Sequence, residues 1–259
     1  MRPKSVAIAH LVPSRTIPAL GALFTLILVS SLALPARAAR EGDRGMDKSR
    51  TYRVTIENLT PNRGNGASQV LSPALVVAHT RRLQLFSPGQ PASPAVADVA
   101  QDAIAATGIS MFSGNPEVVF VGAAGGAVLP GGRTTFEFST HGKARFLSLV
   151  TMLVNTNDGF TGLEGVRLKG RVQEFYVKAY DAGSEVNDQL KASIPGPCCG
   201  DTGRHGTAEH GVIEEHRGIL PGVGELDPAV WGWPTGSAVA HITVERLQGD
   251  DRDDEESDD

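Results

Sequence analysis

The sequence contains little cysteine and few aromatic residues. Two of its 259 residues are cysteines, Cys198 and Cys199, and 5% are aromatic. Two thiolates cannot supply a four-cysteine zinc site. Neighbouring cysteines also lie closer along the chain than ordinary disulfide geometry prefers. A vicinal disulfide, an intermolecular bond and two unpaired thiols therefore all remain open.

The sequence also lacks a surplus of basic residues. The formal net charge is −5, and the C-terminal run "DDRDDEESDD" (250–259) carries eight acids and one arginine. Without that tail and the four cations of residues 1–38, a charge of about −2 remains. A body of this charge does not favour phosphate backbones, so no nucleic-acid partner is expected. We expect residues 249–259 to be a disordered acidic tail.

Long apolar runs are missing after residue 34. The only one, "IPALGALFTLILVSSLAL" (17–34), follows a basic lead and precedes Ala36-Arg37-Ala38. This order is typical of a signal peptide that is cleaved after a small-x-small site, although an uncleaved anchor has similar length. We interpret residues 1–38 as a signal peptide and 39–50 as a disordered linker. The mature chain, with no transmembrane segment, would be secreted, periplasmic or on the cell surface.

From residue 51 the apolar pattern has a period of two, as in "TYRVTIENL", where Tyr52, Val54 and Ile56 alternate with polar residues. Such alternation indicates half-buried strands. Strands are predicted over 51–59, 74–80, 117–122, 133–139, 145–154, 166–170, 172–180 and 238–247. One helix is predicted to begin with Ser93 as N-cap and Pro94 as first residue, and to end at Gly108. Residues 182–234 read as mostly loop.

These elements predict an all-β fold. About eight short strands, one short helix and long loops, without alternating strand–helix units, favour an antiparallel β-sandwich over residues 51–248. Loops at one end of a sandwich converge, so side chains distant in sequence can meet there.

Two polar clusters directly follow strong strands. The first is Asn155-Thr156-Asn157-Asp158-Gly159, and the second, "YDAGSEVND" (180–188), contains Asp181 and Glu185. Carboxylate and amide oxygens are the ligands that calcium prefers, and neither segment has the spacing of an EF-hand loop. Asp, Asn and Gly also favour simple turns. Both interpretations remain open from the residues alone.

Several motifs, in order, resemble the N-terminal domain family of F-spondin and mindin, which also occurs in bacterial exported proteins. "SLVTMLVNTNDGF" (148–160) is similar to a family segment running Met, two apolar residues, Pro-Ser-Pro-Asp-Trp-Phe, which lies over Met152–Phe160 without a gap. "YDAGSE" (180–185) resembles the family's Tyr-Asp-Ala-Gly-Thr-Asp/Glu segment. "LSPALVVAHT", "LFSPGQPAS" and "EEHRGILPGVGEL" agree, so the resemblance covers roughly residues 52–247.

The resemblance implies a sandwich akin to calcium-dependent membrane-binding domains, with one Ca²⁺ at one end and an adhesive extracellular role. It places Asp158, Asp181 and Glu185 as carboxylate ligands, and Asn155 and Asn157 as further oxygen donors. The implied partner is an unidentified extracellular or cell-surface protein or glycan, with peripheral membrane contact conceivable. The family's two prolines and tryptophan are replaced here by Asn155, Asn157 and Gly159. Surfaces built on that tryptophan are therefore in doubt.

Other chemistry has weaker support. The stretch "RHGTAEHGVIEEH" (204–216) offers histidines and glutamates for zinc or copper, but it lacks a His-Glu-x-x-His signature, so surface histidines are the expected explanation. His216 is set apart, because it falls within the segment "EEHRGILPGVGEL" that resembles the family, where it would orient a loop or a carbonyl. No Gly-x-Ser-x-Gly motif or phosphate-binding loop is present. We therefore expect no enzyme. A secreted hydrolase that uses the acidic clusters, and a structural domain without metal, are the alternatives.

Overall fold

In the computed structural model, residues 49–64, 67–80, 83–142, 144–200 and 206–248 are described. They all lie in one compact unit, Gly45–Asp259. The predicted signal peptide, nearly all of the predicted linker and the acidic tail lie outside the described residues. No helix in the described ranges is long and apolar enough to cross a membrane.

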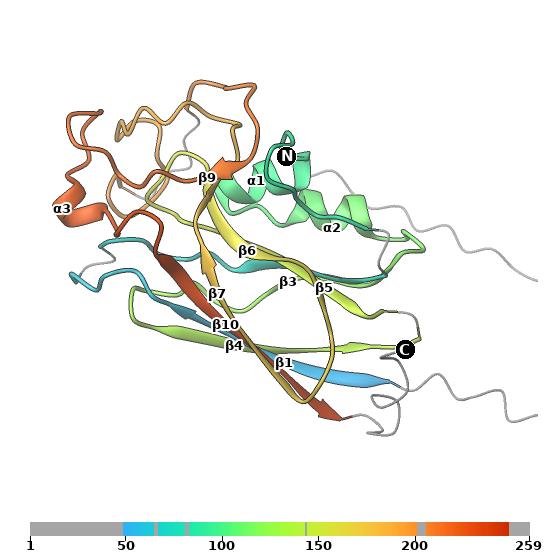
Figure 1. Cartoon of the computed structure of the whole chain (residues 1–259). Helices are drawn as coiled ribbons and strands as arrows, with labels where there is room; N and C mark the ends of the chain where they lie inside the picture. Colours follow the sequence, from blue (N-terminus) through green and yellow to red (C-terminus); the bar gives the residue numbers. More distant parts are fainter. Residues whose placement is uncertain (1–48, 65–66, 81–82, 143, 201–205, 249–259) are drawn as a thin grey trace, which may run out of the picture. The chain divides into compact units, whose positions relative to one another are not determined.

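The described residues form two antiparallel sheets, which confirms the predicted all-β sandwich (Figure 1). One sheet has the strand order β4-β1-β10-β7, and the other has the order β3-β2-β5-β6-β8-β9. The strands are β1 (Arg50–Asn58), β2 (Ala74–His79), β3 (Val118–Ala124), β4 (Arg133–Thr140), β5 (Phe146–Met152), β6 (Gly159–Arg167), β7 (Val172–Lys178), β8 (Tyr180–Asp181), β9 (Glu214–Glu215) and β10 (Ala238–Gln248). The helices are α1 (Pro94–Asp102), α2 (Ala106–Phe112) and α3 (Pro228–Trp231).

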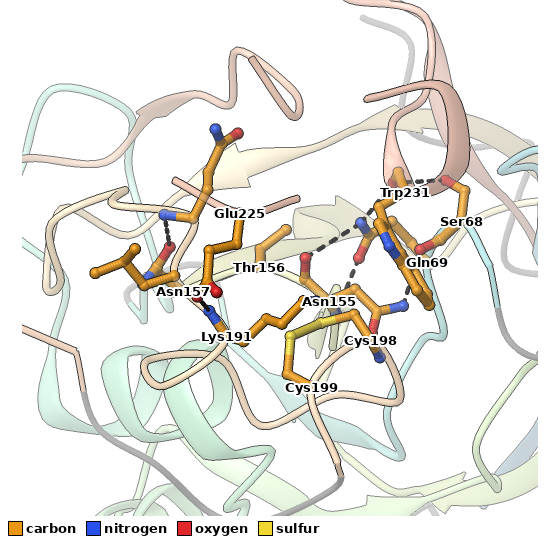
Figure 2. The surroundings of a disulfide bond; sticks show 12 residues. Ser68, Gln69, Asn155, Thr156, Asn157, Lys191, Cys198, Cys199, Glu225 and Trp231 are labelled. Atoms are coloured by element: carbon orange, nitrogen blue, oxygen red, sulfur yellow. Dashed lines mark hydrogen bonds between the residues drawn. A yellow bond between two sulfur atoms is a disulfide. The ribbon is translucent and has the colours of Figure 1, made fainter. Parts of the chain in front are cut away.

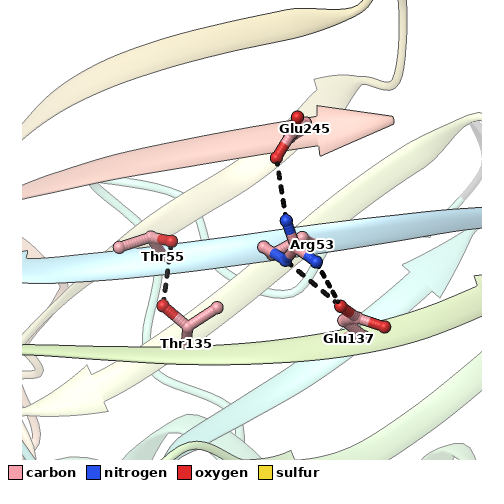
Figure 3. A network of polar contacts seen from close by, with 5 residues as sticks. All are labelled: Arg53, Thr55, Thr135, Glu137 and Glu245. Atoms are coloured by element: carbon pink, nitrogen blue, oxygen red, sulfur yellow. Dashed lines mark hydrogen bonds and ion pairs between the residues drawn. The ribbon is translucent and has the colours of Figure 1, made fainter. Parts of the chain in front are cut away.

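The four-stranded sheet has one apolar and one polar face, as the alternation in residues 51–59 predicts. Tyr52, Val54 and Ile56 of β1 are buried between the sheets. On the outer face, Arg53 donates to Glu137 of β4 at 2.8 Å and to Glu245 of β10 at 3.4 Å (Figure 3). These cross-strand pairs are solvent-exposed, so they align the strands more than they stabilise the fold.

The six-stranded sheet is covered on both faces, which explains why every residue of β2 is buried. Val76 and Ala78 face the core between the two sheets, whereas Leu75 and Val77 pack in a second core with α1. In Figure 1 the helices α1 and α2 lie on the side of this sheet away from the four-stranded sheet. The turn between β5 and β6, which contains the first polar cluster, is therefore part of a sheet with a core on each side.

The single helix predicted from Ser93 to Gly108 is wrong in extent. Ala103 adopts φ 58° and ends α1, and the chain begins α2 three residues later. Gly108 lies inside α2, where a Cβ atom would be 2.3 Å from Leu75 Cδ2. Glycine is therefore present to let α2 approach β2 and not to end a helix. Ser93 precedes α1, but its hydroxyl makes no capping hydrogen bond.

Two strand predictions also need correction. Of the strand predicted at 166–170, only residues 166 and 167 are in a strand, as the end of β6, which already begins at Gly159. Glycines and threonine among the buried residues of β6 mask the alternation. The strand predicted at 172–180 divides at Ala179, where the chain leaves β7 in one sheet and enters β8 in the other. This change of sheet places Asp181 opposite Gly159 of β6. The region 182–234 is mostly loop, as predicted, with β9 and α3 as its regular elements in the described residues.

Gly162 of β6 offers a test of how closely β5 and β6 approach. A Cβ atom at Gly162 would lie 1.9 Å from the backbone oxygen of Leu149. Gly162→Ala should lower the free energy of unfolding by about 1–3 kcal/mol or more, measured by urea denaturation. Gly126→Ala is the control, because no atom lies within 4 Å of its added Cβ. Equal loss in both variants would contradict the close packing of β5 on β6.

Candidate functional site

The candidate site is built on the turn between β5 and β6. Asn155, Thr156, Asn157 and Asp158 are each at most 2% exposed. A buried polar group costs free energy unless it is hydrogen-bonded, so each of these side chains needs partners. Thr156 closes the turn itself: its hydroxyl donates to Leu153 O at 2.6 Å and accepts from Gly159 N at 2.8 Å.

Asn155 joins the turn to two other segments (Figure 2). Its Nδ2 donates to Ser68 O at 2.8 Å, and its backbone N–H donates to the Gln69 side chain at 3.0 Å. Its Oδ1 accepts the backbone N–H of Cys198 at 3.0 Å. Cys198 and Cys199 are bonded to each other, with Cα atoms 3.8 Å apart, so the vicinal disulfide is the alternative that the structure contains. The Asn155 amide thus holds the disulfide loop against residues 68–69.

Asn157 joins the turn to the last residue of the second polar cluster, Asp188, and to the residue after it, Gln189. Its Nδ2 donates to Asp188 Oδ1 at 3.0 Å, and its Oδ1 accepts from Gln189 N at 3.3 Å. The Gln189 side chain continues this connection, because it donates to the carbonyl oxygens of Leu220 and Val223 and accepts from Leu220 N. Gln189 thereby fixes a distant part of the long loop region to the turn.

Asp158 joins the turn to the second acidic cluster with only one of its oxygens. Oδ2 accepts from Ser184 N at 2.7 Å, Ser184 Oγ at 2.9 Å and Glu185 N at 2.9 Å. Oδ1 is buried and has no hydrogen-bond partner. Burial raises the pKa of Asp158 and the nearby charge of Asp181 raises it further, against the Ser184 and Glu185 donors, to about 6. One oxygen of this carboxylate is fully used, and the other is available to a proton or a cation.

Asp181 is the neighbour that acts on Asp158. Its Oδ1 accepts from Gly183 N at 2.7 Å, and its Oδ2 accepts from the Asn187 amide. Burial raises the pKa of Asp181, and these two donors oppose that rise. Each carboxylate oxygen keeps a second lone pair, so these hydrogen bonds leave room for a further contact.

Glu185 contacts Asp158 through its backbone and Gly206 through its side chain. Its backbone N–H binds Asp158, and its Oε1 accepts from Gly206 N at 2.9 Å. A Cβ atom at Gly206 would lie 2.9 Å from Glu185 Oε2 and 3.3 Å from Asn157 Nδ2. The Glu185 carboxylate and the Asn157 amide therefore converge on one glycine.

The structure brings four of the five predicted ligand residues into one neighbourhood: Asp158, Asp181, Glu185 and Asn157. It directs the Asn155 amide elsewhere, to Ser68 and Cys198. In the described part of the chain, no set of three His, Cys, Asp or Glu side chains is placed to hold a metal ion.

Sequence reasoning missed the polar residues that support the turn, namely Gln69, Ser184 and Gln189. Gln69 and Gln189 stand outside any motif, and no local signal marks them as buried. Ser184 lies within "YDAGSE", but nothing in that motif marks it as a partner of Asp158. His216, which falls within the segment that resembles the family, is 4% exposed, and its ring lies 5.2 Å from that of Trp233, centroid to centroid. It is therefore not one of the surface histidines expected for this stretch. His210 is exposed as expected, and His205 lies outside the described residues.

No protein-family model and no curated protein matches the sequence.

The Asp158 carboxyl should make stability depend on pH. Its folded-state pKa of about 6 exceeds the ordinary 3.8, so its stabilising contribution is present at low pH and is lost as the pH rises through about 6. Without divalent cations, the stability of the wild type relative to Asp158→Asn should fall between about pH 4 and about pH 6. The expected change is on the order of 2–3 kcal/mol, measured by urea denaturation at each pH. A difference that does not change with pH would contradict the burial of this charge.

Asn155→Ala should destabilise the fold although no charge is removed. The change leaves the carbonyl of Ser68 and the N–H of Cys198 without their partner, at a cost of roughly 2–4 kcal/mol. Asn155→Asp is the matched control, since below the pKa of the new carboxyl the protonated side chain can accept from Cys198 N and donate to Ser68 O. In chemical denaturation at such a pH, the stability of Asn155→Asp should therefore lie between that of the wild type and that of Asn155→Ala. The reverse order would contradict this role.

Proposed function

We propose that this protein is an exported β-sandwich interaction or adhesion module of the spondin type, which binds one Ca²⁺ between the 155–161 and 180–188 loops. The observation that carries the proposal is Asp158 Oδ1, a buried carboxylate oxygen without a hydrogen-bond partner. Because its twin oxygen accepts three hydrogen bonds, the side chain is fixed in place. A cation at Oδ1 would offset the cost of burying this charge.

The oxygen chemistry around Asp158 suits calcium. Asp181 is close enough for its charge to raise the Asp158 pKa, and the Glu185 backbone is in direct contact with Asp158. Calcium accepts six to eight oxygens of mixed kind, from carboxylates, amides and backbone carbonyls. Asp158 and Asp181 are the central ligands of the proposal, and Glu185 and Asn157 contribute further oxygens. Asn155 is left as a positioning residue, because its amide serves Ser68 and Cys198.

The bound ion would supply positive charge where two acids now repel each other. It would join β6 and its preceding turn to the loop after β8, two segments that already share the contact of Asp158 with Ser184. Extracellular modules bind calcium with dissociation constants of about 10⁻⁴–10⁻³ M, which suits an ion that fixes loops rather than one that signals. The ordered loops would then form the surface for the partner.

The proposal that the protein is exported and adhesive is supported by two sequence features and one structural observation. The sequence features are the signal-peptide pattern, which lies outside the described residues, and the resemblance to the spondin domain family, which indicates the type of module but not its partner. The Cys198–Cys199 disulfide agrees with an oxidising compartment. The proposed partner is an extracellular or cell-surface protein or glycan, with peripheral membrane contact as a further mode.

Calcium should stabilise the mature protein, and Asp158 should be required for this effect. At ten to a hundred times the dissociation constant, binding adds about 1.4–2.7 kcal/mol to the free energy of unfolding. Urea denaturation with CaCl₂ and with chelator should show this gain in the wild type, and Asp158→Asn should lose it.

Glu215→Gln is the matched control, because Glu215 is exposed and paired with Lys178 at 3.0 Å, and it should keep the full gain. Magnesium should give a smaller gain at the same concentration, because it demands a tighter octahedral shell. Equal stability of the wild type with calcium and with chelator would overturn the proposal.

A further inference from the structure

The strand β7 is an edge of the four-stranded sheet, so one side of its backbone faces no other strand of this sheet. The strand order is β4-β1-β10-β7, and β7 pairs with β10 from Glu245↔Val172 to Ala238↔Lys178. In the described ranges, no backbone–backbone hydrogen bond joins residues 172–178 to any strand other than β10. The outward N–H and C=O groups of such an edge can pair with a further strand. β7 is therefore a surface at which a second chain can extend the sheet.

The side chains of β7 are left partly uncovered at this edge. Tyr176 is 67% exposed, the highest value among the exposed large hydrophobic side chains of the described residues. One face of its ring stacks on His241, directly opposite on β10, at 4.4 Å between centroids and 9° between planes. The other face of the ring is thus turned away from β10, toward the position of a next strand. On the inner face of the sheet, Phe175 and Val177 pack against the core but are only partly buried.

The segment 174–178 is complementary to itself when two copies lie antiparallel. In a two-fold arrangement about Tyr176, the exposed Glu174 lies opposite the exposed Lys178 of the second copy. Phe175 then lies opposite the second copy's Val177 on the inner face, and Tyr176 lies opposite its own copy. Directly opposite side chains of antiparallel strands interact, and unlike charges and aromatic pairs stabilise the pairing. The Lys178 ammonium group donates to both oxygens of its neighbour at position 215, and its third hydrogen remains for Glu174.

Charge selects this register over its neighbours. An axis at Glu174 would place two carboxylates opposite each other, and an axis at Lys178 would do the same with two ammonium groups; both arrangements destabilise the pairing. An axis at Phe175 would place Glu174 opposite Tyr176, and an axis at Val177 would place Lys178 opposite Tyr176. The axis at Tyr176 is the arrangement in which both charges of each strand meet an opposite charge.

We propose that two copies of this protein form a symmetric dimer in which the β7 strands pair antiparallel about Tyr176, joining two four-stranded sheets into one. The pairing provides partners for the outward backbone groups of both strands and covers Tyr176, Phe175 and Val177. It needs neither Asp158 nor an ion, so it is independent of the proposed calcium site. Because β7 leads into β8 and the 180–188 loop, antiparallel pairing places the two calcium-binding ends at opposite ends of the dimer. That consequence alone rests on the proposed function, and it would let one dimer bridge two partners.

Sedimentation equilibrium of the mature protein in chelator, from micromolar to millimolar concentrations, tests the proposal. We expect a reversible monomer–dimer equilibrium in the wild type. Glu174→Lys and Lys178→Glu each place like charges opposite each other at two symmetric positions, so each should raise the dimer dissociation constant roughly 10- to 100-fold. The double variant Glu174→Lys/Lys178→Glu restores unlike charges at both positions and should dimerise nearly as the wild type does. Both side chains are exposed, so the variants are expected to fold, which circular dichroism checks.

Glu137→Lys is the matched control, because it reverses a charge on the same outer face but on β4, the other edge of the sheet, where Glu137 pairs with Arg53. It should dimerise as the wild type does. Asp158→Asn should also dimerise normally, so a failure of the calcium proposal is distinguished from a failure of this one. A wild type that stays monomeric over the whole range, single variants with an unchanged dissociation constant, or a folded double variant no tighter than the single variants would each overturn the proposal.

Discussion

The burial of one polar turn is the constraint on which the functional end of this protein depends. Asn155, Thr156, Asn157 and Asp158 are almost completely removed from solvent, so their polar atoms require partners within the protein. Apart from Thr156, these residues find them in stretches far away in the sequence: 68–69, 184–185, 188–189 and 198. The long region after β8 has little regular secondary structure in the described residues, and these hydrogen bonds tie parts of it to the turn. Removing one partner leaves a buried group unsatisfied, which is why the turn and its loops form a single unit.

The turn can bind several distant segments because β5 and β6, the strands on either side of it, are held in the interior of a sheet. β5 and β6 lie in the interior of the six-stranded sheet, with one core against the four-stranded sheet and a second core against the helices. Phe160, two residues after Asp158, is fully buried in the second core and packs edge-on against Phe86 at 5.2 Å. A site built on such strands has its side chains placed within narrow limits, as a binding site requires.

The sequence predicts the positions of strands well where one face of the sheet is exposed to solvent. In β1, polar and apolar residues alternate because solvent lies on one side, and the predicted strand agrees with the structure to within a residue at each end. The prediction fails where both faces are covered or where the chain changes sheet. β6 is buried over its first residues and contains glycine and threonine, so no alternation marks its start. The division of β7 and β8 at Ala179 depends on which sheet offers a partner, which is tertiary information.

The acidic residues of the candidate site could be predicted from the sequence, whereas the polar residues that hydrogen-bond to the turn could not. Asp158, Asp181 and Glu185 stand out because acids directly follow apolar strands, and the structure places them around one turn. Gln69 and Gln189 carry no such pattern, because their burial follows from loop packing. Ser184 lies in the second cluster, but no pattern there indicates its contact with Asp158. His216 lies in the same glycine-rich stretch as the exposed His210, and the sequence pattern does not show that Trp233 packs against its ring.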